Sequence, residues 1–212
     1  MGVWGIVVAG GSGSRFGGAK QFETLGVTRV IDRAVAVTES ACDAVVVVVP
    51  PGQPWDGEPV AAVADGGARR SESVRAGLRA VPSDAEIVVV HDAARPLARA
   101  GLFTAVIAAV RDGADAAVPV VPVADTLKRV DGSLVVATVE RDGLVTVQTP
   151  QAFRADALRA AHADGGDATD DAALVEAGGG TVVVVPGDPG NLKVTTPADL
   201  AVAAALLAAE PA

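Results

Sequence analysis

The sequence predicts a three-layer α/β fold with a mostly parallel sheet, and two patterns carry that prediction. Short runs rich in Val and Ile alternate with Ala- and Leu-rich segments of helical length along the 212 residues. The apolar runs are continuous rather than alternating, which is typical of strands buried on both faces of a parallel sheet. One segment, 125–150, breaks the alternation. Ligands of such a sheet are expected where its strands end.

The expected strands and helices follow one another in regular order. Strands are expected at 4–10, 44–50, 86–92, 116–123 and 181–187. Helices are expected at 29–41, 69–81, 102–113 and 197–209. Right-handed crossovers would place these helices on the two faces of the sheet.

Segment 125–150 has no convincing helical pattern and carries two Asp-Gly pairs, at 131–132 and 142–143. Asp-Gly between β-forming runs is a strong hairpin signal. We interpret the segment as a β-arm that projects from the sheet. An isolated hairpin is marginally stable in water, so we expect its apolar residues, such as Val135 and Val145, to be covered by another surface.

Composition bounds the class of protein. Half of the residues are hydrophobic and only 3% are aromatic, so a sizeable core must be built from Val, Ala and Leu. The net charge of −9 argues against a nucleic-acid partner. Cys42 is the only cysteine, which favours a reducing cytoplasm. No export signal or membrane-spanning run is visible. We expect one cytoplasmic domain over 1–212, with no second catalytic domain after it.

The stretch VVAGGSGSRFGGAKQF, residues 7–22, follows the start of the first expected strand. It lacks the third glycine of a dinucleotide fingerprint because Phe16 stands there, although Asp32 lies about where a ribose-binding acid would be. It also fails as a Walker loop, since Ala19 intervenes before Lys20 and no hydroxyl residue follows. Both standard nucleotide motifs are therefore incomplete.

What remains is a strand, a Gly/Ser loop and two cations, Arg15 and Lys20. Glycines let backbone N–H groups approach a polyphosphate closely. The cations would stabilise charge that builds on phosphorus during displacement. The alternative is a flexible turn with solvated charges, but the strand context and the two cations favour phosphate binding.

AGGSGSR at 9–15 followed by AKQF at 19–22 resembles the loop of the nucleotidyltransferases in its cytidylyltransferase form, with Ala19 in place of the usual proline. HDAARP, 91–96, is highly specific and resembles the 2-C-methyl-D-erythritol 4-phosphate cytidylyltransferases, which join CTP to methylerythritol phosphate in non-mevalonate isoprenoid synthesis. Further matches follow in the family's order at DGGARRSESV (65–74), DTLKR (125–129), TVERDGL (138–144), QTPQAF (148–153) and NLKVTTPADL (191–200). The resemblance covers almost the whole chain and implies a Rossmann-like nucleotidyltransferase sheet.

The resemblance also implies site residues. The catalytic residues would be Arg15, Lys20, Arg141 and Lys193. CTP would be bound by Ala9, Gly10, Gly11, Gly13, Gly67, Ser73 and Asp92. Methylerythritol phosphate would be bound by Arg95, Thr126, Arg141, Thr169 and Lys193. Ala68 stands where the family usually has Asp, so its contact would be through the main chain. On the residues alone, Thr169 and Asp170 also fit a helix cap, and Arg141 fits a solvated charge.

His91, His162 and one cysteine cannot form a standard zinc site by themselves, and no Ser-His-Asp or Cys-His constellation is evident. This pattern argues against a covalent intermediate, which agrees with direct in-line attack and catalysis by positioning and charge. The resemblance implies that the substrate phosphate attacks the α-phosphorus of CTP. Mg²⁺ would be held chiefly by the triphosphate, with Asp92 the protein acid best placed to help.

Partners and rivals complete the expectations. The family's arm is covered by a second subunit, so the resemblance implies a homodimer in which Arg141 enters the neighbour's pocket. The nearest alternative is a ribitol-5-phosphate cytidylyltransferase. A molybdopterin nucleotidyltransferase would explain neither HDAARP nor the arm. A non-catalytic nucleotide-binding protein would not need Arg15, Lys20 and Lys193 at the reacting phosphorus.

Overall fold

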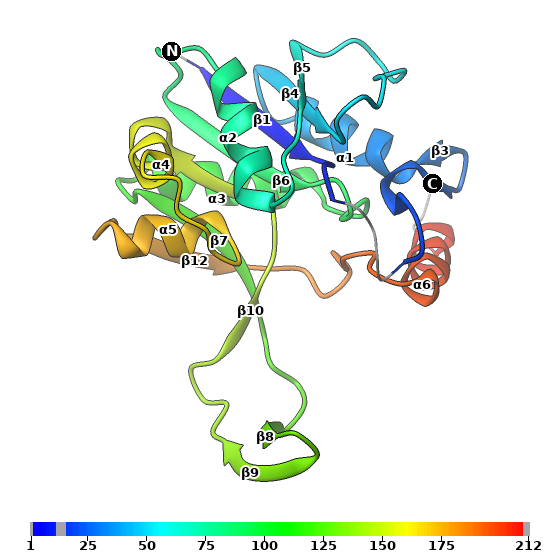
Figure 1. Cartoon of the computed structure of the whole chain (residues 1–212), viewed down its shortest axis with the longest axis vertical. Coiled ribbons are helices and arrows are strands. Elements are labelled where there is room, and N and C mark those ends of the chain that lie inside the picture. Colours follow the sequence, from blue (N-terminus) through cyan, green and yellow to red (C-terminus); the bar gives the residue numbers. More distant parts are fainter. Residues whose placement is uncertain (1, 12–15, 210–212) are drawn as a thin grey trace.

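The computed structural model describes residues 2–11 and 16–209, and most of its strands join one sheet (Figure 1). The strands of this sheet are β1 (Val3–Val8), β4 (Ala44–Val49), β5 (Ala62–Asp65), β6 (Ile87–Asp92), β7 (Ala116–Pro122), β10 (Val145–Val147), β11 (Gln151–Arg154) and β12 (Val182–Pro186). Their order is β10-β7-β11-β6-β1-β4-β5, and β12 pairs with β7. Two short pairs lie outside it: β2 (Thr24–Leu25) with β3 (Thr28–Arg29), and β8 (Leu127–Asp131) with β9 (Leu134–Val139).

The sheet is mixed, with a parallel centre. β1 lies parallel to β4 and β6, β4 to β5, and β7 to β12. β11 runs antiparallel between β6 and β7, and β10 runs antiparallel to β7. The predicted α/β class with a mostly parallel sheet is confirmed, and each expected strand is present within a few residues of its predicted bounds.

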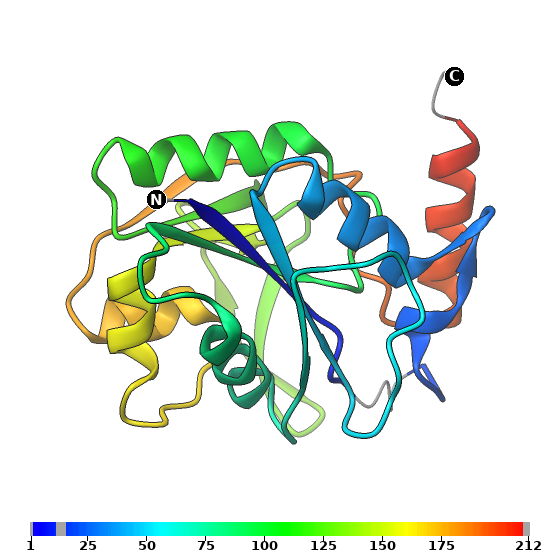
Figure 2. The ribbon, with the colours of Figure 1, turned by 90° about the horizontal axis from the view of Figure 1, so that it is seen from above.

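Helices cover both faces of the sheet (Figure 2). They are α1 (Val30–Glu39), α2 (Arg70–Ala80), α3 (Ala100–Arg111), α4 (Ala155–His162), α5 (Asp171–Ala177) and α6 (Pro197–Ala208). Val74 of α2, Leu158 of α4 and Val175 of α5 pack in one core cluster, while α1 and α3 pack against the other face. α6 lies beside β2 at the edge of the molecule. Among the described helices, none is long and apolar enough to span a membrane.

Valine-rich strands build the core, as the composition requires. Val45 to Val49 are each at most 2% exposed, and their side chains alternate between the two core layers. This two-sided burial explains why the apolar runs are continuous in the sequence. Phe103 and Phe153 are the largest fully buried side chains described.

The arm leaves the sheet between β7 and β10, which pair at its base, and extends well away from the helices (Figure 1). The first Asp-Gly pair forms the expected hairpin, since Asp131 pairs with Leu134 and Gly132 has φ +55°. At the second, the Leu144 N–H donates to the Arg141 carbonyl at 2.9 Å. That turn joins no hairpin in the described chain, because β10 pairs with β7 instead of β9. The second hairpin prediction is therefore wrong.

Candidate active site

The glycine loop and the HDAARP motif meet where the parallel strands finish. Val8, the last residue of β1, pairs in register with Asp92, the last residue of β6. The glycine loop follows β1 directly, and the turn at 66–69 follows β5. Because the carboxyl ends of parallel strands share one edge of a sheet, the fold brings these distant motifs together.

A hollow of about 120 Å³ lies at this edge. The predicted site residues that line it are Gly10, Gly11, Lys20, Gly67, Ser73, Asp92 and Lys193. A Cβ at Gly10 would lie 2.7 Å from Ser73 Oγ, so glycine is required there for the loop to approach α2. The same hydroxyl accepts a hydrogen bond from the Gly67 N–H at 3.2 Å. The glycine loop, the turn after β5 and α2 are thus in direct contact.

A second hollow, of about 260 Å³, adjoins the first. Its predicted site residues are Asp92, Arg95, Thr169 and Lys193. Arg70, Asp92 and Lys193 line both hollows and therefore stand between them. The site has two halves with a charged cluster at their junction.

Asp92 is the centre of that cluster. Its Oδ1 accepts a hydrogen bond from Arg70 Nε at 3.1 Å, and its Oδ2 accepts one from Lys193 Nζ at 2.6 Å. Burial alone would raise the pKa of Asp92, but the charges of Arg70 and Lys193 outweigh burial and hold that pKa well below its usual range. The carboxylate is ionised under all physiological conditions.

Comparison with known proteins identifies the family of this chain. The family model of 2-C-methyl-D-erythritol 4-phosphate cytidylyltransferase matches residues 3–209. The chain belongs to this cytidylyltransferase family. It is therefore a nucleotidyltransferase, and the family and enzyme class predicted from the sequence are confirmed.

Relatives of the cytidylyltransferase family match most of the chain. The 2-C-methyl-D-erythritol 4-phosphate cytidylyltransferase of Frankia casuarinae is 49% identical over 214 residues, which cover 96% of this chain and 80% of that protein. The crystal structure of the Thermus thermophilus enzyme of the same name is 36% identical with a TM-score of 0.83, covering 95% of this chain and 97% of that one.

Some members of the cytidylyltransferase family are longer. The bifunctional enzyme IspD/IspF of Anaeromyxobacter dehalogenans is 48% identical over 227 residues, covering 98% of this chain and 57% of that protein. The chain thus spans a little over half the length of the bifunctional relatives it matches.

Arg70 lines both hollows of the candidate site and contacts Asp171, and neither residue was predicted from the sequence. Arg70 Nη1 donates to Asp171 Oδ2 at 2.6 Å, while its Nε holds Asp92. Burial alone would lower the pKa of Arg70, but the two carboxylates raise it above its ordinary value. One signal was available in the sequence: an arginine in the first turn of a helix opposes the helix dipole, and a nearby carboxylate would offset that repulsion. Which carboxylate it meets depends on the tertiary fold.

Some predicted residues of the cytidylyltransferase site lie elsewhere. Thr126 and Arg141 are exposed on the arm and line neither hollow. Arg141 Nη1 donates to the carbonyls of Val123, at 3.1 Å, and Ala124, which directly precede the arm in the same chain. Asp170 also caps α5, accepting a hydrogen bond from the Ala173 N–H at 3.0 Å, beside Thr169. Ala9 is buried and donates its N–H to the Val48 carbonyl at 2.8 Å. Gly13 and Arg15 lie outside the described residues.

A buried histidine supports the main chain of Asp92 in the candidate site. Thr149 Oγ1 accepts a hydrogen bond from the Asp92 N–H at 3.0 Å and lies 3.2 Å from His91 Nδ1. His91 Nε2 lies 3.2 Å from the Arg95 carbonyl. This network assigns the proton to Nε2, with Nδ1 accepting from the threonine hydroxyl. Burial lowers the pKa of His91 to about 4, so the ring is neutral.

His91 should make the protein acid-labile. Below about pH 6.5 the unfolded chain protonates this histidine while the folded chain does not, so the unfolded state binds more protons and stability falls. We expect the free energy of unfolding to drop by about 2 kcal/mol from this residue between pH 7.5 and pH 5. Urea titrations at both pH values measure the drop. His91→Gln should be less stable at pH 7.5 but lose less on acidification, and an equal loss in both proteins would contradict this assignment.

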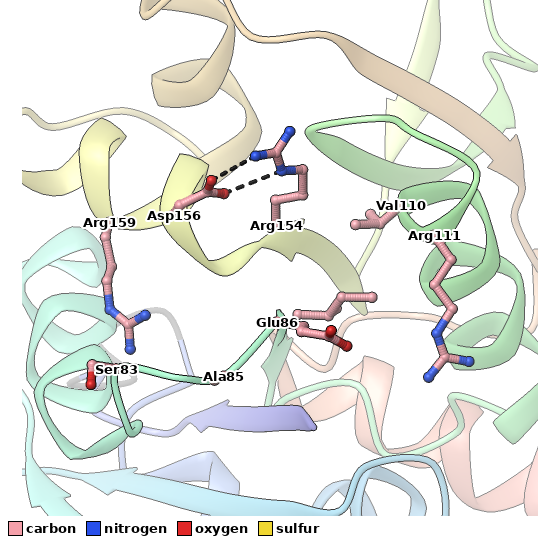
Figure 3. Close-up of a pocket in the computed structure, with 9 residues that line it drawn as sticks. Ser83, Ala85, Glu86, Val110, Arg111, Arg154, Asp156 and Arg159 are labelled. Atoms are coloured by element: carbon pink, nitrogen blue, oxygen red, sulfur yellow. Dashed lines mark hydrogen bonds and ion pairs between the residues drawn. The ribbon is translucent and has the colours of Figure 1, made fainter. Parts of the chain in front are cut away.

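Another hollow, of about 580 Å³, lies at the opposite edge of the sheet, where β6 begins (Figure 3). Two of its arginines bind neighbouring groups: Arg154 Nη2 pairs with Asp156 Oδ2 at 2.6 Å (Figure 3), and Arg159 Nη2 donates to the Val81 carbonyl at 3.0 Å. None of the predicted site residues lines it. We assign no part of the cytidylyltransferase site to this hollow.

Proposed function

We propose that this chain transfers CMP from CTP to 2-C-methyl-D-erythritol 4-phosphate and releases pyrophosphate, in non-mevalonate isoprenoid precursor synthesis. The family match over residues 3–209 supports this reaction. The observation that carries it in the structure is the contact of Asp92 with Lys193, at 2.6 Å, beside the glycine loop. Neither ribitol 5-phosphate transfer nor a non-catalytic role is favoured by the matches.

The chemistry needs no protein nucleophile. The phosphate monoester of the substrate is anionic near neutral pH, so one of its oxygens forms the new bond to the α-phosphorus of CTP. The bond from that phosphorus to the β-phosphate oxygen breaks, and its electron pair leaves with pyrophosphate. No general base is needed. Burial raises the pKa of the Cys42 thiol to about 12, so this thiol is unsuited to covalent catalysis.

The protein supplies position and charge. The N–H groups of Gly10 and Gly11 would bind the triphosphate in the first hollow, with Lys20 and Arg15 stabilising the crowded phosphorus. Gly67 and Ser73 would meet the base, with Ala9 at the strand end. Lys193 lies at the junction of the hollows, where it would move from Asp92 to the incoming phosphate. Arg95 and Thr169 would bind the substrate in the second hollow.

Asp92 fits a role in holding Mg²⁺. This ion takes oxygen ligands, usually one or two carboxylates together with substrate phosphates and waters. Each carboxylate oxygen of Asp92 accepts one hydrogen bond from a cation and has a further lone pair. Asp92 is the residue that would hold the ion, which would supply charge neutralisation of the triphosphate.

The arm points to a second copy of the chain, and we propose a homodimer. Apolar side chains stand exposed on it, with Leu134 70% and Val135 62% accessible. Such a patch on a two-stranded arm needs a covering surface. Arg141 and Thr126 lie outside both hollows of their own chain, so segment 125–150 would carry them into the partner's site. The cytoplasmic location and the lack of a nucleic-acid partner remain predictions from composition.

Substrate choice tests the proposed reaction. With Mg²⁺ and CTP, methylerythritol phosphate should release pyrophosphate at least about tenfold more efficiently than ribitol 5-phosphate, because a site with polar groups for one substrate leaves them unpaired with another. GTP should be a poor donor. Coupled assays of pyrophosphate with each polyol phosphate give kcat/KM for both. Comparable or faster turnover of ribitol 5-phosphate would overturn the assignment.

A further inference from the structure

Gln21 lies against the inner side of the glycine loop. Its side chain is only 3% exposed. Its Nε2 donates to the Ala9 carbonyl at 2.7 Å and to the Gly11 carbonyl at 3.3 Å. A primary amide has two N–H donors, so one group serves both carbonyls, on either side of Gly10. No predicted catalytic role uses this residue.

The two carbonyls matter because of what the loop is proposed to bind. A loop that holds a polyphosphate must present N–H groups and turn its carbonyl oxygens away, since those oxygens repel phosphate oxygens. Gln21 draws the carbonyls of Ala9 and Gly11 toward its own buried carboxamide. Gly10 and Gly11 line the first hollow, and Gln21 is not among its lining residues.

Gln21 also belongs to the turn that carries Lys20. The 3₁₀ turn η1 (Lys20–Phe22) is closed by the Glu23 N–H, which donates to the Lys20 carbonyl at 3.2 Å. The guanidinium of Arg29 lies 6.0 Å from the centre of the Phe22 ring. The turn is therefore in contact with Arg29 through Phe22 and with the glycine loop through the carboxamide of Gln21.

We propose that Gln21 is a positioning residue of the CTP site, which fixes the carbonyls of the glycine loop away from the triphosphate and places Lys20 at the reacting phosphorus. This role rests on the proposed binding of CTP over the loop. It requires a side-chain donor at position 21, and a group of equal size without donors should not replace it.

Two substitutions test the donor. Gln21→Met keeps length and approximate volume without donors, and Gln21→Glu keeps the shape but places an oxygen against the two carbonyls. Each should raise the KM for CTP about tenfold or more and lower kcat, with the KM for methylerythritol phosphate changed less than about twofold. Steady-state kinetics and calorimetric titration with Mg–CTP measure these effects. If Gln21→Met does not fold, Gln21→Asn can be used, since its amide donors are one methylene closer to the backbone. It should raise the KM for CTP by a smaller factor and leave the KM for methylerythritol phosphate nearly unchanged.

Thr38→Val is the matched control for stability. Thr38 is fully buried in α1 and donates to the Ala34 carbonyl at 2.7 Å, away from the loop. The Thr38→Val substitution should lower the melting temperature without changing the KM for CTP. If the Gln21 variants behave in the same way, the positioning role is overturned. If Lys20→Ala abolishes turnover while the Gln21 variants keep their KM, only the role of Gln21 fails. If Lys20→Ala is also without effect, the proposed CTP site fails as well.

Discussion

Replacing Lys20 by alanine should lower turnover by roughly 10²–10³-fold, the usual loss for one charge partner of the transition state. Lys20 begins the η1 turn and lines the first hollow together with Asp92 and Lys193. It is not part of the buried core, so the folded structure should survive its loss. Pyrophosphate release under saturating substrates gives the effect on kcat.

Arg79→Ala is the control for charge alone, because Arg79 is an exposed cation in the last turn of α2, outside both site hollows. Its turnover should stay close to that of the unmodified enzyme. Near-normal turnover of Lys20→Ala would show that Lys20 is a solvated charge, and the proposed transition-state role would be lost.

Mixed dimers of Lys20→Ala and Arg141→Ala should recover activity that neither variant has alone. If each site takes Lys20 from one chain and Arg141 from its partner, a mixed dimer holds one site with both lesions and one site with none. Both homodimers should be nearly inactive. Refolding the two variants together should therefore restore turnover toward the level of one intact site per mixed dimer.

The expected recovery depends on confirmed exchange of subunits. Differently tagged chains purified through both tags provide dimers of known composition. Should such dimers stay inactive, Arg141 serves its own chain and the shared site is excluded. If sedimentation shows that the protein is a monomer, the proposal that a second copy of the chain covers the arm is refuted.

The central strands and the main helices were predictable because their signals are local. A run such as Val45 to Val49 is buried on both faces, and no polar residue interrupts it. β5 and β11 were missed because each has only four residues. β11 is an antiparallel strand whose partners, β6 and β7, come from distant parts of the sequence. At the second Asp-Gly pair the local turn forms as predicted, but the strand that follows it, β10, pairs with β7 and not with β9.

The candidate site could be predicted where it depends on motifs at strand ends, such as Asp92 and the glycine loop. Arg70 and Gln21 could not, because their partners are fixed by tertiary contacts. Arg70, in the first turn of α2, meets Asp171, at the start of α5, although the two residues are 101 positions apart in the sequence. In the sequence, Gln21 stands where a Walker loop would have a hydroxyl residue, and only the folded structure places its amide against the loop carbonyls.

Because β7 pairs with β10 at the base of the arm, the sheet can fold within one chain whether or not the arm binds a second chain. Val120 and Val147 stay in register, so the chain leaves the sheet and returns to it without altering the strand order. A chain in which the arm is deleted and β7 is joined to β10 by a short turn should keep the sheet, the glycine loop and the pair of Asp92 with Lys193. It would have no arm to insert into the site of a partner chain. If the proposed homodimer shares its sites between chains, the fold forms within one molecule, whereas a complete site forms only at enzyme concentrations that support the dimer. On dilution below the dissociation constant of the dimer, specific activity should fall while the protein remains fully folded.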